Sequence, residues 1–378
     1  MRYIKNLLDI PQLSEAERAA LKPVAEAYAF RATDYYLGLI DWSDPADPIR
    51  RLIIPRADEL NDWGTLDASN EAANTVMRGL QHKYPDTALL LCNEVCGAYC
   101  RYCFRKRLFM NENDEASKGL CEGVDYIGAH PEITNVLLTG GDPLLLSTRR
   151  LTETIAALRE IEHVEIIRIG SKMTAFNPMR VLDDPALVDM FSTYSTPYKR
   201  IYVMNHFDHP RELTDVAIQA IDRLIRAGVI MTNQCPMIAG INDHAEILSE
   251  LFGRLASIGC PQYYVFQGRP TAGNDPYKVP IVCGWEIFRE ALRHGAGLAR
   301  RARFVMSHET GKIEVLAVDE RHIYLRYHRA KDANLRGRFL VYKRNDDAHW
   351  LDDLEPAEEG AAPRFAHESL LDTVDGPE

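Results

Sequence analysis

Four cysteines lie within the segment CNEVCGAYCRYCFRKR, residues 92–107, and their spacing could hold an iron–sulfur cluster. The pattern C-x3-C-x2-C fits Cys96, Cys100 and Cys103, whereas Cys92 adds a second x3 step without an x2 partner. Three thiolates on one loop can bind three irons of a [4Fe–4S] cluster and leave the fourth iron open to another ligand. Zinc is the alternative, but structural zinc sites need four ligands, usually as two C-x2-C pairs, and this segment offers none.

The segment TGGDPLL, residues 139–145, is a second candidate for ligand binding. It follows an apolar run, and its two glycines, Gly140 and Gly141, would let backbone groups approach a ligand closely. A double glycine alone is a weak signal. It gains weight because it follows the cysteine segment by one predicted strand and helix.

Both segments lie at the ends of short apolar runs that alternate with amphipathic stretches. Six runs are predicted as strands: TALLLC (87–92), TNVLLTG (134–140), VEIIRIG (164–170), RIYVMNHF (200–207), GVIMTNQ (228–234) and QYYVFQG (262–268). Helices are predicted between them, for example over 212–228, with Thr214 as N-cap and Gly228 at the C′ position. After the first strand, starts recur at about thirty residues, the length of a βα unit, which predicts a parallel sheet. Six units indicate a partial barrel. The periodicity alone is also compatible with an open doubly wound sheet.

The segments on either side of this repeating pattern differ from it. Residues 1–80 predict helix, with Ser14 as an N-cap. After residue 300 the pattern predicts a strand, a loop and a hairpin, with another strand at 339–344. Residues 351–378 hold nine acids and one base, so this predicted solvated tail carries −8 of the net charge of −11.

Composition excludes several classes of protein. Hydrophobic residues make up 46% and charged residues 26%, as in soluble globular proteins. The acidic balance argues against nucleic-acid and membrane-surface partners, and no apolar stretch is long enough to span a membrane. The first residues lack the pattern of a signal peptide, and the cysteines do not suggest a disulfide framework, so we expect a cytoplasmic protein.

The three-cysteine loop and the double glycine resemble the signature of the radical S-adenosylmethionine (SAM) enzymes. Within that class, residues from about 80 to 330 resemble the lysine 2,3-aminomutase family in the order and spacing of their motifs. The matching motifs are YPD (84–86), CxxxCRYCFRKR, LLTGGDPLL, HVEIIRIGSK (163–172), NHFDHP (205–210), NQ (233–234), GIND (240–243), YYVFQ (263–267) and GKIEV (311–315).

This resemblance implies an α/β fold, a partial (β/α)6 TIM-type barrel with an N-terminal helical extension and a C-terminal β-hairpin segment. The expected divisions are an N-terminal helical region at 1–82, the radical SAM barrel at 83–300, a C-terminal lysine loop and hairpin at 301–350, and the acidic tail at 351–378.

The resemblance also implies three cofactors: a [4Fe–4S] cluster on the three cysteines, SAM, and pyridoxal 5′-phosphate (PLP). Lys312 is the lysine implied to bond PLP, and Lys83 is implied to bind its phosphate. Arg105 is implied to hold the substrate carboxylate, whereas Lys106 and Arg107 fit surface positions better. The residues implied to contact SAM are Tyr102, Gly140, Gly141, Asp142, Ser171, His206 and Gln234. His209 is expected to line the same pocket as His206.

Three positions depart from the family pattern. Arg269 stands where lysine-specific members have an aspartate for the distal ammonium, so an anionic side chain such as that of glutamate or aspartate is expected to fit better. Lys83 and Thr87 replace two phosphate-binding arginines, which weakens the PLP prediction. His244 replaces a zinc-binding cysteine, and no zinc is expected.

The sequence therefore predicts a PLP-dependent radical SAM aminomutase that moves the α-amino group of an acidic amino acid to the β-carbon. A PLP-independent radical SAM enzyme, such as an epimerase or a protein-modifying enzyme, is the alternative. The expected partners are the amino-acid substrate and an electron donor such as flavodoxin or ferredoxin, and a homo-oligomer is expected.

Overall fold

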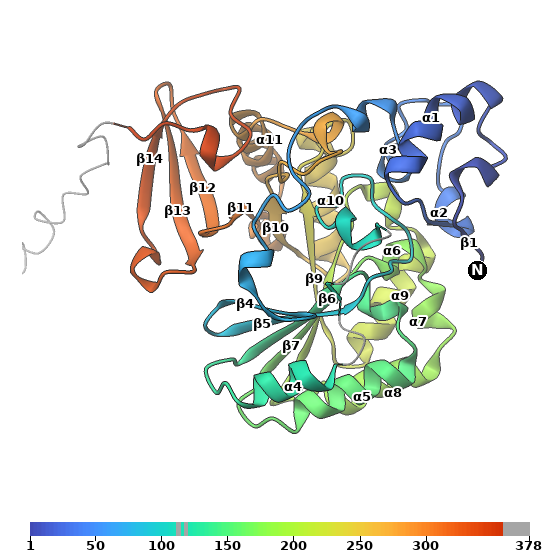
Figure 1. Ribbon diagram of the computed structural model, residues 1–378, viewed down its shortest axis with the longest axis vertical. Coiled ribbons are helices and arrows are strands. Elements are labelled where there is room, and N and C mark those ends of the chain that lie inside the picture. Colours follow the sequence, from blue (N-terminus) through green and yellow to red (C-terminus); the bar gives the residue numbers. More distant parts are fainter. Residues whose placement is uncertain (111–114, 117–119, 358–378) are drawn as a thin grey trace, which may run out of the picture.

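The computed structural model describes residues 1–110, 115–116 and 120–357 (Figure 1). Within this part of the chain, twelve strands form one continuous sheet in the order β14-β13-β12-β11-β10-β9-β8-β7-β6-β5-β4-β3. Their bounds are β3 Thr75–Met77, β4 Leu80–Tyr84, β5 Thr87–Asn93, β6 Asn135–Gly140, β7 Ile166–Ser171, β8 Ile201–Asn205, β9 Ile230–Pro236, β10 Gln262–Phe266, β11 Arg303–His308, β12 Gly311–Val318, β13 His322–Ala330 and β14 Phe339–Lys343.

The central strands β5 to β11 pair in parallel and in chain order. Antiparallel strands extend both edges, β3 and β4 at one side and β12 to β14 at the other. The predicted α/β fold with a partial TIM-type barrel is confirmed. The parallel series has seven members and not the expected six, because helix α11 (Ile281–His294) acts as one more crossover and returns the chain to β11.

Helices cover the outer face of the parallel strands (Figure 1). They are α4 Cys121–Gly128, α5 Thr148–Arg159, α7 Met179–Leu182, α8 Pro185–Tyr194, α9 Asp215–Arg226, α10 Ala245–Ser257 and α11, whereas the short α6 (Met173–Phe176) follows β7 at the rim. In α9 the Thr214 side chain caps the start as predicted, and Gly228 has a positive φ of 85° beyond the end. None of the helices in the described ranges is both long and apolar enough to cross a membrane.

Strand alternation divides the sheet into a core face and an inner face. In β7, for example, Ile167 and Ile169 are fully buried against the helices, whereas Arg168 and Gly170 line the interior of the barrel. Successive side chains of a strand point to opposite faces, so polar residues at alternate positions are delivered to the interior. The carboxyl ends of the strands open at one rim, where the site is built.

The N-terminal region forms a second hydrophobic core above this rim. Its helices are α1 Glu15–Ala27, α2 Asp34–Leu37 and α3 Pro48–Ile53, and Ser14 caps α1 through a capping box with Glu17. Their apolar side chains pack against barrel residues that include Ala98, Tyr102 and Phe176. The region is less helical than predicted, since it also contains β1 (Tyr3–Ile4), β2 (Ala32–Thr33), β3 and most of β4.

The C-terminal segment begins with the antiparallel strands β12 to β14. Lys312 was predicted in a loop, but it is the second residue of β12. The start of the predicted acidic tail is packed, because Leu351 and Leu354 are buried and Pro356 bridges Tyr342 of β14. Residues 358–378 lie outside the described residues.

Candidate active site

A cavity of about 350 Å³ opens at the carboxyl ends of the parallel strands. This volume lies within the usual range for small-molecule sites. With the one exception of His209, the residues that the sequence nominated for this pocket line the cavity: Lys83, Cys96, Cys100, Tyr102, Cys103, Arg105, Gly140, Gly141, Asp142, Ser171, His206, Gln234, Arg269 and Lys312. Residues more than two hundred positions apart are thereby brought to one surface.

The loop after β5 places three cysteine side chains at this cavity. Cys96, Cys100 and Cys103 are free thiols of intermediate exposure, whereas Cys92 is buried within β5, where its Sγ donates to the carbonyl of Thr139 at 3.4 Å. Burial raises the pKa of each of the three lining thiols above its usual value. Thiolates would therefore need compensating positive charge, which iron supplies, and this donor set fits a cluster held by three cysteines.

The double glycine lets the end of β6 pack directly against the cysteine loop. Gly140 has a φ of 109°, and a Cβ on Gly141 would lie 2.4 Å from the carbonyl oxygen of Val95. The amide of Gly141 donates to Asn93 O at 2.5 Å and that of Asp142 to Val95 O at 3.0 Å. The glycines thus fix the position of the cysteine loop in addition to exposing backbone to the cavity.

Asp142 is a buried carboxylate held by the neighbouring strand. It accepts hydrogen bonds from Ser171 Oγ at 2.8 Å and from the amides of Lys172 and Leu144 at 2.8 and 3.0 Å. Burial raises its pKa to about 6 despite these donors. Asp142 and Ser171 were predicted as separate SAM contacts, and in the structure they form one hydrogen-bonded unit.

A buried ion network that the sequence did not reveal lies under the cysteine loop. Lys172 Nζ contacts Asp208 at 2.5 Å and Glu212 at 2.7 Å, and both carboxylates are fully buried. Tyr102 donates to Asp208, and Tyr36 of the N-terminal region donates to Glu212. The network therefore connects the cysteine loop, the ends of β7 and β8, and the N-terminal helical region. Lys172 and Asp208 stood within matched motifs, but nothing in one sequence marked them as partners.

Replacing Lys172 with methionine should lower the free energy of unfolding by about 3–5 kcal/mol, because two buried carboxylates would lose their countercharge. Urea denaturation of the purified protein measures this change. The matched control is Lys343→Met, whose partner Glu355 is 78% exposed, and it should change stability by less than about 1 kcal/mol. Equal losses in the two variants would contradict a special role for the buried network.

His209 does not line the cavity, contrary to the prediction. Its Nδ1 accepts from the amide of Arg211 and caps the short 3-10 turn Pro210–Glu212, while His206 alone faces the cavity. Across the described ranges no group of three or more His, Cys, Asp or Glu residues is arranged around a single metal ion. The two histidines therefore have different roles: His209 caps a turn, and His206 forms part of the cavity wall.

Lys312 extends from β12 into the cavity beside two aromatic rings. Its Nζ lies 4.1 Å from the ring centroid of Tyr264 and 5.2 Å from that of Phe266. Burial, with the nearby guanidiniums of Arg168 and Arg329, lowers its pKa well below the usual value. A neutral amine beside aromatic rings fits a pyridoxal aldehyde, because only the neutral form attacks a carbonyl. Gly311 has no positive φ; it is glycine because a Cβ would lie 2.3 Å from Arg329 O of β13.

The cavity wall is strongly cationic. Among the described residues, its acids are Glu71 and Asp142, and its eight bases are Lys83, Arg105, Arg168, Lys172, Arg269, Lys278, Lys312 and Arg329. Lys172, Lys278 and Arg329 already pair with carboxylates outside the wall, and the lowered pKa of Lys312 favours its neutral form. Anionic ligands are favoured by the remaining excess of positive charge.

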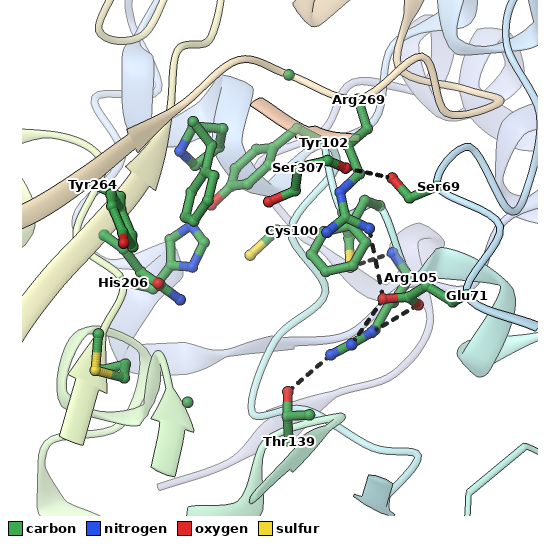
Figure 2. Close-up of a pocket in the computed structure, with 18 of the residues that line it drawn as sticks. Ser69, Glu71, Cys100, Tyr102, Arg105, Thr139, His206, Tyr264, Arg269 and Ser307 are labelled. Atoms are coloured by element: carbon green, nitrogen blue, oxygen red, sulfur yellow. Dashed lines mark hydrogen bonds and ion pairs between the residues drawn. The ribbon is translucent and has the colours of Figure 1, made fainter. Parts of the chain in front are cut away.

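Glu71 holds together the two arginines that were predicted to bind substrate (Figure 2). Arg105 contacts both of its oxygens, at 3.1 and 2.9 Å, and also donates to Thr139 Oγ1 at 2.9 Å. Arg269 Nη1 lies 3.6 Å from Glu71, and its guanidinium stacks 3.7 Å from the ring centroid of Phe104. Burial alone would raise the pKa of Glu71, but the guanidiniums outweigh it and keep that carboxyl well below its usual range.

The two neighbouring bases of the RKR run were predicted at the surface, and this was wrong. Lys106 is buried and donates to the carbonyl of Gly273, and Arg107 contacts Glu71 at 2.8 Å and Glu115 at 2.8 Å. Arg269 does not turn outward to pair with a surface acid: its side chain is 18% exposed and faces Glu71, while the nearby Asp275 pairs with Lys278.

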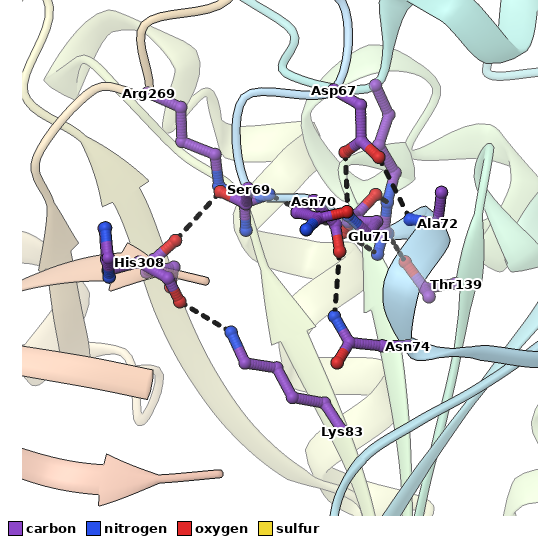
Figure 3. Close-up of polar contacts among 12 residues, drawn as sticks. Asp67, Ser69, Asn70, Glu71, Ala72, Asn74, Lys83, Thr139, Arg269 and His308 are labelled. Carbon is purple, nitrogen blue, oxygen red and sulfur yellow. Dashed lines mark hydrogen bonds and ion pairs between the residues drawn. The ribbon is translucent and has the colours of Figure 1, made fainter. Parts of the chain in front are cut away.

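Figure 3 shows the segment that carries Glu71 between Arg269 and His308 on one side and Thr139 on the other. Asp67 accepts from the amides of Glu71 and Ala72, and Ser69 Oγ donates to Ser307 O at 2.9 Å. No sequence motif marked Glu71. A signal did exist, however, because several arginines predicted near one pocket require a buried carboxylate.

Comparisons with known proteins agree with this site. No family model matches the chain. It is 54% identical to a protein of Aquifex aeolicus provisionally named an L-lysine 2,3-aminomutase, over 93% of this chain and 95% of that one. It is 36% identical to the L-lysine 2,3-aminomutase of Clostridium subterminale (75% and 68% covered) and 32% identical to the glutamate 2,3-aminomutase of Clostridioides difficile (78% and 69%). A solved radical SAM methyltransferase from Sphaerobacter thermophilus overlaps 60% of this chain and 68% of its own, with a TM-score of 0.41 and 17% identity.

A three-cysteine loop at the end of the first parallel strand of a partial barrel, together with the aminomutase relatives, defines a radical SAM enzyme. With relatives matched over most of its length, the chain belongs to the lysine 2,3-aminomutase family. Its members are isomerases, and the family implies a [4Fe–4S] cluster, SAM and PLP as cofactors.

Proposed function

We propose that this protein is a PLP-dependent radical SAM 2,3-aminomutase whose substrate carries an anionic side chain. The observation that carries the PLP part is the position of Lys312, whose amine faces the same cavity as Cys96, Cys100 and Cys103. When bound, the cluster and SAM supply a carbon-centred radical, and PLP holds the migrating nitrogen. The protein's task is to bring these groups and the substrate together within one enclosed site.

Arg105 is the proposed partner of the substrate's α-carboxylate. Its Nη1 donates to the neutral hydroxyl of Thr139, so a carboxylate could replace that hydroxyl while both contacts to Glu71 are kept. A guanidinium bound in this way presents a fixed donor direction beside the cysteine loop. The N-terminal core above the rim limits the access of water and oxygen to the site.

The substrate's side chain is proposed to be anionic because, among the residues that the structure describes, the cavity wall has no carboxylate available for an ammonium. Both oxygens of Glu71 are engaged by Arg105, one of them also by Arg107 and the other facing Arg269. Asp142 accepts from Ser171 and two backbone amides. A lysine substrate would thus place its ammonium beside the buried Arg269 without an acceptor, whereas glutamate or aspartate would pair with it.

An anaerobic substrate screen tests the proposal. The reconstituted protein is given SAM, dithionite and single amino acids, and 5′-deoxyadenosine and β-amino acid are measured. Glutamate or aspartate should give both products, and lysine should give at most a few per cent of that turnover. Lys312→Ala should lose the PLP absorbance and the product. Turnover without bound PLP would instead support the PLP-independent alternative.

A further inference from the structure

The strand that faces Lys312 carries a second basic side chain toward the cavity. In the antiparallel pair β12–β13, Lys312 is the Cα partner of Arg329, and the next pair is Ile313 with Tyr327. His328 is therefore an extra residue, a β-bulge. Bulges turn a strand's side chains and occur next to active sites. Both Lys312 and Arg329 line the cavity, as cross-strand partners on one face.

The guanidinium of Arg329 lies at the junction of β4 and β5. Its Nη2 donates to Thr87 Oγ1 at 3.1 Å, and its Cζ lies 4.2 Å from the ring centroid of Tyr84. Its ion-pair partner is Asp86, whose side chain is 58% exposed. Arg329 is thus held in place by a hydroxyl, a ring and a solvated acid.

Two more cations face this part of the cavity. Lys83 Nζ donates to the carbonyl of His308 at 2.6 Å (Figure 3), and Arg168 Nε donates to Asn135 Oδ1 at 2.8 Å. Neither has a carboxylate partner in these contacts. Burial and the charge of Arg269 lower the pKa of Lys83 to about 8. An anion bound beside Lys83 would therefore stabilise its protonated form.

We propose that Arg329 binds the phosphate of the pyridoxal cofactor, with Thr87 beside it, and so supplies from β13 the guanidinium that the start of β5 lacks. The inference rests on the proposed function, since it assumes that Lys312 bonds PLP. The aldehyde and the phosphate-bearing group occupy adjacent ring positions of PLP. A phosphate site must therefore lie within a side chain's reach of the lysine, as the cross-strand partner does.

The exchange of partners at Arg329 is chemically favourable. Asp86 is exposed, and solvated ion pairs contribute little to stability. A phosphate with nearly two negative charges can accept from the guanidinium fork and from Thr87 Oγ1, and it can rest near Lys83. The alternative is that Arg329 only joins the C-terminal hairpin to the β4–β5 turn.

Binding of PLP and of pyridoxal, which lacks the phosphate, separates the two roles. With the full chain, reconstituted and freed of PLP, affinity is read from the absorbance that Lys312→Ala abolishes. Arg329→Ala should weaken PLP binding by roughly 10- to 100-fold, the range for one charge-assisted hydrogen bond, and leave pyridoxal binding unchanged. Arg329→Lys should fall between the wild type and Arg329→Ala.

Two further variants complete the test. Arg326→Ala removes an arginine of the same strand that pairs with Glu314 outside the cavity wall, and it should change neither affinity. Asp86→Asn removes the exposed partner and should keep or strengthen PLP binding. Equal losses for PLP and pyridoxal in Arg329→Ala, or a loss in Asp86→Asn as large as that in Arg329→Ala, would overturn the proposal. A wild-type protein that binds neither compound at Lys312 would contradict the proposed function itself.

Discussion

Replacing any one of Cys96, Cys100 and Cys103 with alanine should abolish the iron–sulfur cluster and all SAM cleavage. Each residue is expected to hold one iron, and in the described part of the chain no fourth cysteine lines the cavity to replace a lost one. The wild type should bind about four irons and four sulfides per chain after anaerobic reconstitution. Each variant should lose the broad visible absorbance of the cluster and release no 5′-deoxyadenosine.

Cys92→Ala is the control for this experiment. Cys92 is buried in β5 and donates to Thr139 O instead of facing the cavity. Its replacement should leave the iron content unchanged and should lower stability by only about 1 kcal/mol, as expected for a small buried side chain. A Cys92→Ala protein without iron, or a Cys103→Ala protein with a full cluster, would show that a different set of cysteines holds the metal.

The fold was largely predictable because it rests on local signals. Apolar runs of strand length at intervals of about thirty residues, with caps such as Thr214 and positive-φ glycines such as Gly228, specify βα units without knowledge of long-range contacts. The parallel pairing of β11 was missed because it depends on where α11 leads the chain. The packing at residues 351–357 was missed because three acids are interspersed with the apolar residues there, although Leu351 and Leu354 decide the packing.

The site was predictable where motifs report chemistry and not where pairing decides it. Spacing nominated the three cysteines, and resemblance nominated Lys312, Arg105 and Arg269. Whether an arginine in a pocket is free or already paired depends on a second residue that can lie anywhere in the chain. For Arg105 and Arg269 that residue is Glu71, thirty-four positions upstream of Arg105. The ion pairs of a buried site are therefore the feature that is hardest to predict from a single sequence.

Arg269→Asp should weaken the use of an acidic substrate far more than the use of any other amino acid. The substitution removes a buried cation and sets a new carboxylate close to Glu71, from which Arg269 Nη1 is now 3.6 Å away. Removing one partner of a buried charge pair costs roughly 2–5 kcal/mol, so kcat/KM for glutamate or aspartate should fall by about 30-fold to several thousand-fold.

Three comparisons make the Arg269 result specific. Arg269→Lys keeps the positive charge without the planar stack on Phe104, so it should retain part of the activity toward the acidic substrate. Arg344→Ala, at an arginine that pairs with Asp346 and does not line the cavity, should retain all of it. Iron and PLP content should stay at wild-type levels in each variant, because Arg269 is assigned to neither cofactor.

The ratio of glutamate to lysine turnover is the decisive quantity: it should favour glutamate in the wild type and shift toward lysine in Arg269→Asp. If the wild type uses lysine as readily as glutamate, or if Arg269→Asp lowers both rates equally, Arg269 serves to hold Glu71 in place and does not select the substrate.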